Sequence, residues 1–254
     1  MLAAAVVPGV VIGAALGLLG GGGSVLTVPI FVYVLGFAPK EAIAMSLAVV
    51  AATSGVGSAT HWRAGNVNVR VAMVFGGVAM LGTLIGVRLA RFVPGTVQLA
   101  LFAAVMLVAA LFMLRGQSPP DAGLAERNVS LSLTAPKVIP GALAVGTLTG
   151  IVGVGGGFLI VPALVLMRLS LRQAVGTSLL VITGTCVIGF LGYVRHVRLD
   201  WLAVALVAAG TLPGIAMGSY LHRFVPQPML RRGFAVFLMV SAAFILLENL
   251  NGRP

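Results

Sequence analysis

The chain has 254 residues, of which 59% are hydrophobic and 8% are charged, and its formal net charge is +11. A soluble domain carries charge on about a quarter of its residues, so a chain this poor in charge cannot cover its surface with polar groups. The positive charge does not indicate nucleic-acid binding, because the basic residues lie mostly near the ends of apolar segments, where they face lipid headgroups. We therefore expect an all-α polytopic membrane protein.

Eight apolar segments are candidates for membrane helices, since a spanning helix needs roughly 20 apolar residues. The first, residues 3–35, is interrupted at Gly20–Gly23, and the fifth, residues 138–167, is interrupted at 153–157. The other segments cover residues 42–61, 70–90, 96–114, 173–193, 200–221 and 229–247. The sequence thus predicts a membrane repeat over residues 1–115, a polar linker loop over 116–137 and a second membrane repeat over 138–250.

The two interrupted segments are copies of each other. The stretch from Gly17 to Pro29 and the stretch from Gly150 to Pro162 share seven identical residues at a shift of 133. After a gap of one residue the shift becomes 132, and it then pairs Ser46 with Ser178, Thr53 with Thr185 and Arg63 with Arg195. A duplicated unit with glycine-broken segments at matching positions is typical of secondary transporters. We predict two pseudo-symmetric repeats, each with three to four spanning helices.

The relative orientation of the repeats depends on the path of the broken segments. If each broken segment crosses the membrane once, the repeats are parallel and the basic residues divide eight against eight between the two faces. If each returns to the side that it entered, the repeats are inverted and the division is ten against six. The ten are Arg63, Arg70, Arg115, Arg127, Lys137, Arg168, Arg172, Arg223, Arg231 and Arg232. An excess of basic residues on one face favours inversion, and the parallel arrangement stays open.

The glycine-rich breaks are the candidate substrate site. A helix that unwinds in lipid leaves backbone groups unsatisfied, unless protein, water or a ligand pairs with them. The segment after each break begins with a helix N-terminus, whose N–H groups suit an anion. We predict two backbone cradles for one oxyanion, with Ser24 as a helix N-cap and Thr27 in the first turn. The cradles are formed by Gly22, Gly23 and Ser24 and by Gly155, Gly156 and Gly157. The alternative is that small residues only let helices pack closely.

Matched polar residues complete the predicted site. The hydroxyls of Ser46, Thr53, Ser178 and Thr185 are candidates for the substrate shell, although such hydroxyls also bond to their own helices or join neighbouring ones. Arg63 and Arg195 stand at segment ends, where they either recruit an anion at the two mouths of a pathway or anchor the topology.

The absence of acids from the segment centres favours an anionic substrate. None of the five acids, Glu41, Asp121, Glu126, Asp200 and Glu248, lies in the middle of a segment, whereas cation pathways use buried carboxylates or carbonyl-rich rings. The single cysteine, Cys186, reads as a small buried hydrophobe, and three scattered histidines suit no metal site. We expect no metal or cofactor. No ATP-binding or hydrolase motif is present, so an enzyme is not expected.

These motifs resemble the TauE/SafE family of sulfite exporters. A glycine-rich stretch that ends in Val-Pro occurs in each half, followed by Ala-x-x-x-Ser-Leu at residues 42–47 and 174–179. The resemblance implies a multi-pass carrier of the inner membrane for small sulfur-containing anions. The second copy has Gly157 in place of Ser24, which argues against a fully symmetric site.

We predict an alternating-access transporter that exports sulfite or an organosulfonate. Its expected partners are the small anion and the lipid bilayer, with no nucleic acid, and a homo-oligomer is an open option. An anion channel and a membrane scaffold without transport are the alternatives.

Overall fold

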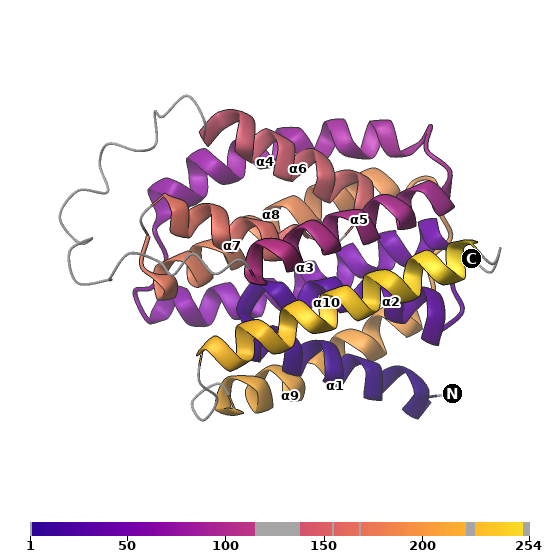
Figure 1. Ribbon diagram of the computed structural model, residues 1–254, viewed down its shortest axis with the longest axis horizontal. Helices are drawn as coiled ribbons and strands as arrows, with labels where there is room; N and C mark the ends of the chain where they lie inside the picture. The colour runs from indigo at the N-terminus through magenta and orange to yellow at the C-terminus, as the bar shows by residue number, and fades with distance from the viewer. Residues whose placement is uncertain (1, 115–137, 154, 168, 222–226, 251–254) are drawn as a thin grey trace.

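The computed structural model describes residues 2–114, 138–153, 155–167, 169–221 and 227–250, and within them every regular element is helical (Figure 1). The α-helices are α1 (Leu2–Leu19), α2 (Thr27–Pro29), α3 (Pro39–Arg63), α4 (Val69–Ala90), α5 (Gly95–Leu114), α6 (Val138–Val152), α7 (Gly157–Leu166), α8 (Leu171–Tyr193), α9 (Trp201–Leu221) and α10 (Gln227–Leu250). A 3₁₀-helix, η1 (Gly20–Leu26), and a π-helix, η2 (Ile30–Val34), flank α2. The predicted linker, residues 116–137, lies outside the described residues.

Four of the described helices are long and apolar enough to cross a membrane, namely Pro39–Arg63, Val69–Ala90, Gln173–Tyr193 and Trp201–Gly218. Shorter apolar helices accompany them, including Val138–Val152 and Ala235–Asn249. The all-α, multi-pass prediction is therefore confirmed.

Helix-capping residues set the starts of the long helices. The side chain of Asn68 accepts a hydrogen bond from the Val71 N–H at 3.1 Å, and Asp200 accepts one from the Ala203 N–H at 3.0 Å. Each side chain thus accepts a hydrogen bond from an N–H group that has no partner within its own helix. α3 begins earlier than residue 42, because Pro39 lacks an N–H and suits the first helical position.

Two pairs of helices are in direct backbone contact through glycines. α1 packs against α9, and α4 packs against α6. A Cβ atom on Gly13 would overlap the carbonyl oxygen of Thr211, and one on Gly146 would overlap that of Ala79. Gly13 and Gly146 are 133 residues apart, and Ala79 and Thr211 are 132 apart, so the two shifts of the sequence comparison relate the two contacts. Small residues allow this close approach inside a membrane.

The helix ends gather at two ends of the bundle, which we name end A and end B. At end A, the Asn249 side chain donates to the Thr96 carbonyl at 3.0 Å, and Gly95 lies against Pro39. At end B, the Asn68 N–H donates to the Thr177 hydroxyl at 2.9 Å. α1 begins and α10 ends at end A (Figure 1).

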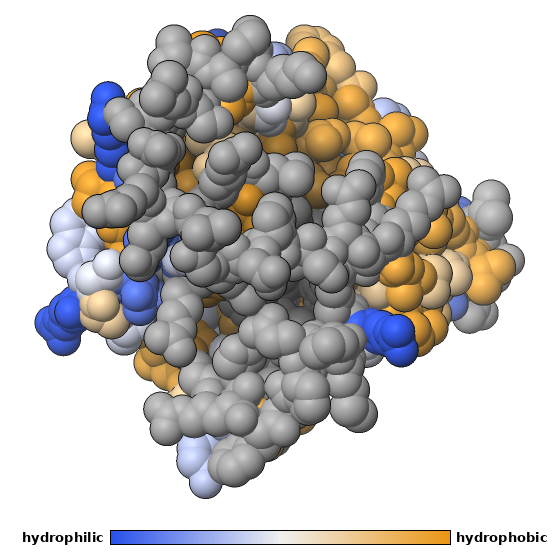
Figure 2. Space-filling model, turned by 60° about the vertical axis from the view of Figure 1, so that its left-hand side comes forward, coloured by the Kyte–Doolittle hydropathy of each residue, from blue (hydrophilic) through white to orange (hydrophobic). Residues whose placement is uncertain are grey.

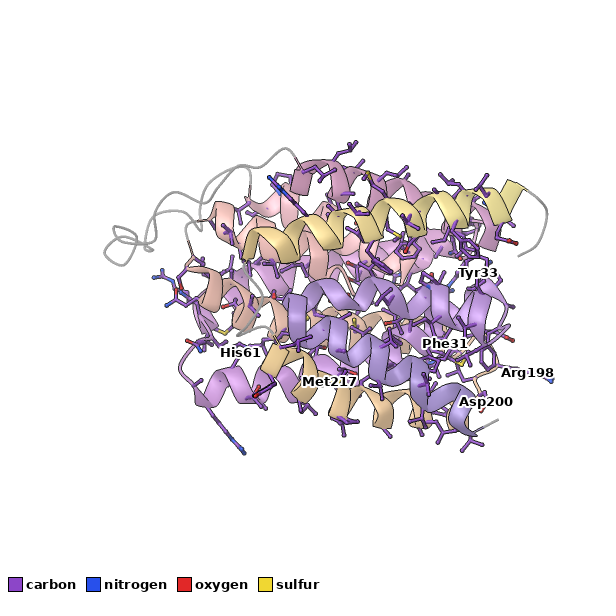
Figure 3. All side chains as sticks on the ribbon, turned by 60° about the horizontal axis from the view of Figure 1, so that its bottom comes forward. Phe31, Tyr33, His61, Arg198, Asp200 and Met217 are labelled. Atoms are coloured by element: carbon purple, nitrogen blue, oxygen red, sulfur yellow. The ribbon has the colours of Figure 1, made fainter. Side chains whose placement is uncertain are left out.

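The central helices α3 and α8 lie side by side and run in opposite directions. His61, near the end of α3, lies at end B, whereas Arg198, which follows α8, lies at end A (Figure 3). Tyr33, which follows the first glycine break, lies near end A, so the chain from α1 turns back after the break (Figure 3). The first half of the chain therefore starts from end A and the second half from end B.

The interior is apolar with inserted hydroxyls. Apart from the Tyr193 hydroxyl, the buried polar side chains among the described residues belong to Ser, Thr and Gln. Many large apolar side chains are exposed, including Met73, which is 67% exposed, and orange patches lie between the grey atoms in Figure 2. Such an exterior fits a lipid solvent.

Candidate functional site

The first glycine stretch does not form the predicted bare helix end. Residues Gly20–Leu26 form a 3₁₀-helix, whose i→i+3 bonds pair the backbone without full unwinding. Ser24 lies inside this helix, and the residue before α2 is Leu26, which makes no side-chain cap. The prediction that Ser24 is a helix N-cap is therefore wrong. Gly22 and Gly23 lie in the same 3₁₀-helix, and Gly23 packs against the backbone of Leu16 on α1.

The second glycine stretch is a true interruption. α6 ends at Val152 and α7 begins at Gly157. Gly153, Gly155 and Gly156 have φ angles of +79°, +69° and +65°, in the left-handed region that glycine adopts at no steric cost. Gly156 is the N-cap of α7 and offers no side chain to the free N–H groups of the first turn. The two copies thus turn by different local geometries.

Ser46 on α3 holds the second break in place. Its hydroxyl donates to the carbonyl oxygen of Gly153 at 2.6 Å, and the Ile43 carbonyl of its own helix lies at 2.8 Å. A Cβ atom on Gly153 would overlap the side chain of Ile43. The structure therefore brings one predicted hydroxyl of the first half to the glycine stretch of the second half.

The other predicted hydroxyls are buried and bond mainly to their own helices. The hydroxyls of Ser178 and Thr185 donate to the carbonyls of residues 175 and 181 at 2.8 and 3.1 Å. Thr53 donates to the carbonyl of residue 49 at 2.6 Å, and its Oγ1 lies 3.1 Å from Oγ1 of Thr211 on α9. These contacts are the bonding to own and neighbouring helices that was the alternative to a substrate shell.

Two buried threonines beside the breaks have unpaired hydroxyls. Thr27 follows the first break and is fully buried, and Thr149, one turn before Gly153, is 3% exposed. Neither Oγ1 has a hydrogen-bond partner in the structure, although helical threonines usually bond to the preceding turn. A buried polar group left unpaired costs about 1–3 kcal/mol. Both hydroxyls are therefore available to a ligand.

Thr149 also defines the shape of the second break. A Cβ atom on Gly156 would overlap the Thr149 Oγ1 atom, so only glycine fits opposite this hydroxyl. Gly155 lies against Sγ of Cys186, with Val50 and Ile182 beside it. Cys186 is fully buried, as predicted for a small hydrophobe. The break thus has an apolar wall on one side and the Thr149 hydroxyl on the other.

A buried tyrosine fixes the last turn of α6 before the break. The hydroxyl of Tyr193, at the end of α8, donates to the Gly150 carbonyl at 3.1 Å. The amide of Gln98 on α5 contacts the Tyr193 hydroxyl at 3.4 Å and the Ala90 carbonyl at 3.1 Å. This link ties α4, α5 and α8 to the helix that leads into the break.

Sequence comparison of the two repeats missed Thr149 and Thr211. At the shifts of 133 and 132, Thr149 pairs with Leu16 and Thr211 pairs with Ala79. A search for matched polar pairs therefore discards both residues. Thr149 could have been found from its position in the sequence, because it lies four residues, about one helical turn, before the first glycine of the break.

The two predicted mouth arginines stand at opposite ends of the bundle. Arg63 is the last residue of α3, at end B, and is exposed. Arg195 follows α8, at end A, and lines a pocket that it shares with Arg88 and Arg91. The structure places neither arginine at the glycine breaks.

The comparisons with known proteins cover nearly the whole chain. The sequence pattern of the family described as "Sulfite exporter TauE/SafE" matches residues 5–245. A "Probable membrane transporter protein" of Xylella fastidiosa is 35% identical over 242 residues, which are 94% of this chain and 92% of the relative. "Probable membrane transporter protein YdhB" of Bacillus subtilis is 28% identical over 243 residues, 93% of this chain and 96% of the relative.

A more distant relative extends the range of organisms. "Probable membrane transporter protein MJ0441" of Methanocaldococcus jannaschii is 24% identical over 259 residues, covering 95% of this chain and 94% of the relative. No solved structure matches the chain. Because the family pattern spans almost every described helix, the chain belongs to the TauE/SafE family of sulfite exporters, a family of membrane transporters rather than an enzyme class.

Proposed function

We propose that this protein is a secondary transporter of the inner (plasma) membrane that exports a small sulfur-containing oxyanion, such as sulfite or an organosulfonate. The observation that carries the proposal is the second glycine break, where a left-handed turn faces the unpaired, buried hydroxyl of Thr149. Family membership supports transport of such an anion.

The chemistry of the second break fits an oxyanion. The Leu159 N–H bonds to the Gly156 carbonyl at 2.9 Å, so the two N–H groups before it are the ones without a partner within α7, and they lie at the positive end of its dipole. The hydroxyl of Thr149 can donate because it has no partner, and the hydroxyl of Thr27 has the same freedom after the first break. The described acids Glu41, Asp200 and Glu248 lie in the first turn of α3, just before α9 and in the last turn of α10, away from the breaks. The substrate would thus meet donors and no carboxylate.

The site has one open cradle and one closed cradle. Gly155, Gly156 and Gly157 supply the buried helix start, while Gly22, Gly23 and Ser24 in their 3₁₀-helix contribute a second wall, because η1 packs against α7. Ser46 orients the open cradle through Gly153. Thr53, Ser178 and Thr185 line the helix interfaces around it, and Arg63 and Arg195 attract the anion at the two ends.

We infer that the two halves are inverted repeats that exchange access between end A and end B. The related contacts of Gly13 with Thr211 and of Gly146 with Ala79 support a repeat, and the opposite directions of α3 and α8 support inversion. For inverted repeats the sequence divides the basic residues ten against six, and the face with ten includes Arg63, which lies at end B. By the positive-inside rule, end B faces the cytoplasm.

Efflux of ³⁵S-sulfite from proteoliposomes tests the proposal. We expect saturable efflux that external unlabelled sulfite accelerates, because a carrier exchanges its substrate. A conductance without saturation or exchange would show an anion channel instead of a carrier. The absence of any flux from folded protein would favour a membrane scaffold without transport.

Removing the Thr149 hydroxyl tests whether the substrate binds at the second break. Thr149→Val keeps the side-chain shape and should lower efflux about tenfold or more, the usual effect of one lost hydrogen bond to a charged group. The control is Thr147→Val, two residues away, whose hydroxyl bonds to the Leu143 carbonyl at 2.9 Å. Equal flux in the two variants would remove Thr149 from the site.

A further inference from the structure

A basic pocket lies at end A, away from the glycine breaks. It has a volume of about 410 Å³ and opens between the last turn of α4 and the last turn of α8. Its lining consists of Leu84, Val87, Arg88, Arg91, Leu191, Gly192, Arg195 and His196. Both helices are membrane-span candidates, so the pocket lies where the spans reach the end of the bilayer.

The charge of the pocket is positive and is not balanced within its lining. Three arginines contribute, and no carboxylate lines the pocket. Asp200, the acid that follows in the chain, caps α9 through the Ala203 N–H at 3.0 Å. A helix C-terminus attracts a cation through its dipole, which could explain the basic residues at the end of each single helix. It does not explain why the cations of two helices share one pocket.

Glycine makes the convergence possible. A Cβ atom on Gly192 would lie 2.5 Å from Cγ1 of Val87, so the two helices could not approach as closely with any other residue there. Arg88 and Arg91 from the end of α4 then line the same pocket as Arg195, which follows α8. Arginine guanidinium groups are well suited to pair with the oxygens of a phosphate.

The apolar part of the pocket faces the bilayer. Leu84 precedes Arg88 by one turn and is 39% exposed, and Leu191 precedes Arg195 by the same interval and is 55% exposed. Leu84 and Arg88 therefore lie on one face of α4, and the turn after α8 brings Arg195 to the same pocket as Leu191. Phe92, next to the pocket, is 87% exposed. This order of apolar and cationic groups follows the order of acyl chains and headgroup in a phospholipid.

We propose that this pocket binds an anionic phospholipid, with its headgroup phosphate between Arg88, Arg91 and Arg195 and its acyl chains along Leu84 and Leu191. Basic pockets between membrane helices bind anionic headgroups in this way. A free oxyanion would need the arginines but not the exposed leucines. The lipid site lies away from the glycine breaks and shares only Arg195 with the proposed transport residues, and it does not depend on the identity of the transported anion.

Native mass spectrometry of the detergent-purified protein tests the proposal. Phosphatidylglycerol and phosphatidylcholine with identical acyl chains are titrated separately. We expect phosphatidylglycerol to bind at least about tenfold more tightly, and Arg88→Gln/Arg195→Gln to abolish the preference. The control Arg70→Gln/Arg198→Gln removes the same charge from exposed arginines outside the pocket and should keep the preference.

Three outcomes decide the question. A preference that survives Arg88→Gln/Arg195→Gln, or that the control also loses, overturns the site. Competition by millimolar inorganic phosphate as strong as that by phosphatidylglycerol shows a free-anion site instead of a lipid site. The four arginines are exposed, so all variants should keep the wild-type gel-filtration profile. Sulfite efflux is not the readout, so loss of the transport proposal would leave this result standing.

Discussion

The hydroxyl of Ser46 donates to the carbonyl oxygen of Gly153 at 2.6 Å, and this bond joins the central helix of the first half to the glycine turn of the second half. A carbonyl freed by a left-handed turn needs a donor when it is buried. Ser46 is fully buried and supplies it. The geometry of the candidate site therefore depends on a residue 107 positions away in the sequence.

Ser46→Ala should destabilise the fold and reduce transport together. The variant leaves the buried Gly153 carbonyl without this donor, which costs about 1–3 kcal/mol. Ser58→Ala is the matched control, because the Ser58 hydroxyl bonds only within α3, to the Gly55 carbonyl at 2.8 Å. Thermal unfolding in detergent and sulfite efflux are measured on both. Equal losses in the two variants would contradict the role of the Ser46 bond.

Gly156→Ala should disable the second break. The backbone there has φ of +65°, and the new methyl group would overlap Oγ1 of Thr149. The left-handed conformation alone costs about 1–2 kcal/mol in a non-glycine residue, and we expect a lower unfolding temperature with little remaining efflux. Gly77→Ala in α4 is the control, since its added Cβ meets no atom within 4 Å. A fully active Gly156→Ala would show that the left-handed turn is not required.

Cys186 reports the opening of the site. It is the single cysteine, it is fully buried, and its Sγ lies beside Gly155. We expect slow alkylation by N-ethylmaleimide in the resting protein and a changed rate when an organosulfonate is added, because alternating access must move the break. The organosulfonate replaces sulfite because sulfite reacts with maleimides. Cys186→Ser gives the background, and a rate that no substrate alters would argue against movement at the break.

The start of α1 and the end of α10 should lie outside the cytoplasm. This follows from the positive-inside assignment, because α1 begins and α10 ends at end A. Alkaline phosphatase fused after residue 254 should be active, and green fluorescent protein fused there should be dark. The same reporters inserted in residues 116–137 should give the reverse pattern. A fluorescent C-terminal fusion would place end A in the cytoplasm.

The positions of the helices and of the two glycine stretches could be predicted from the sequence. Apolar length and terminal charge locate spans directly, and the structure has helices over the segments predicted at 70–90, 96–114 and 173–193. The geometry within a break was not predictable from composition. Glycine permits both a 3₁₀-helix and a left-handed turn, and packing against neighbouring helices selects between them, so Ser24 was assigned to a cap that does not form.

The candidate site shows a second limit of sequence comparison. Matching the two halves found Ser46, which does meet a break, but it could not find Thr149 or the Thr211 hydroxyl beside Thr53. Those residues have no polar counterpart in the other half. A pathway for one small anion needs only one set of donors at each level, so functional groups need not be duplicated even when the helices that carry them are.

The glycine contact between α1 and α9 has a consequence for biosynthesis. α1 is made before the other described helices, whereas α9, whose Thr211 carbonyl it meets through Gly13, is made after α3 to α8. The glycine face of α1 must therefore stay in contact with lipid, or with the insertion machinery, until α9 has been translated. A ribosome that stalls in the second half would leave this face uncovered, a ready signal for membrane quality control.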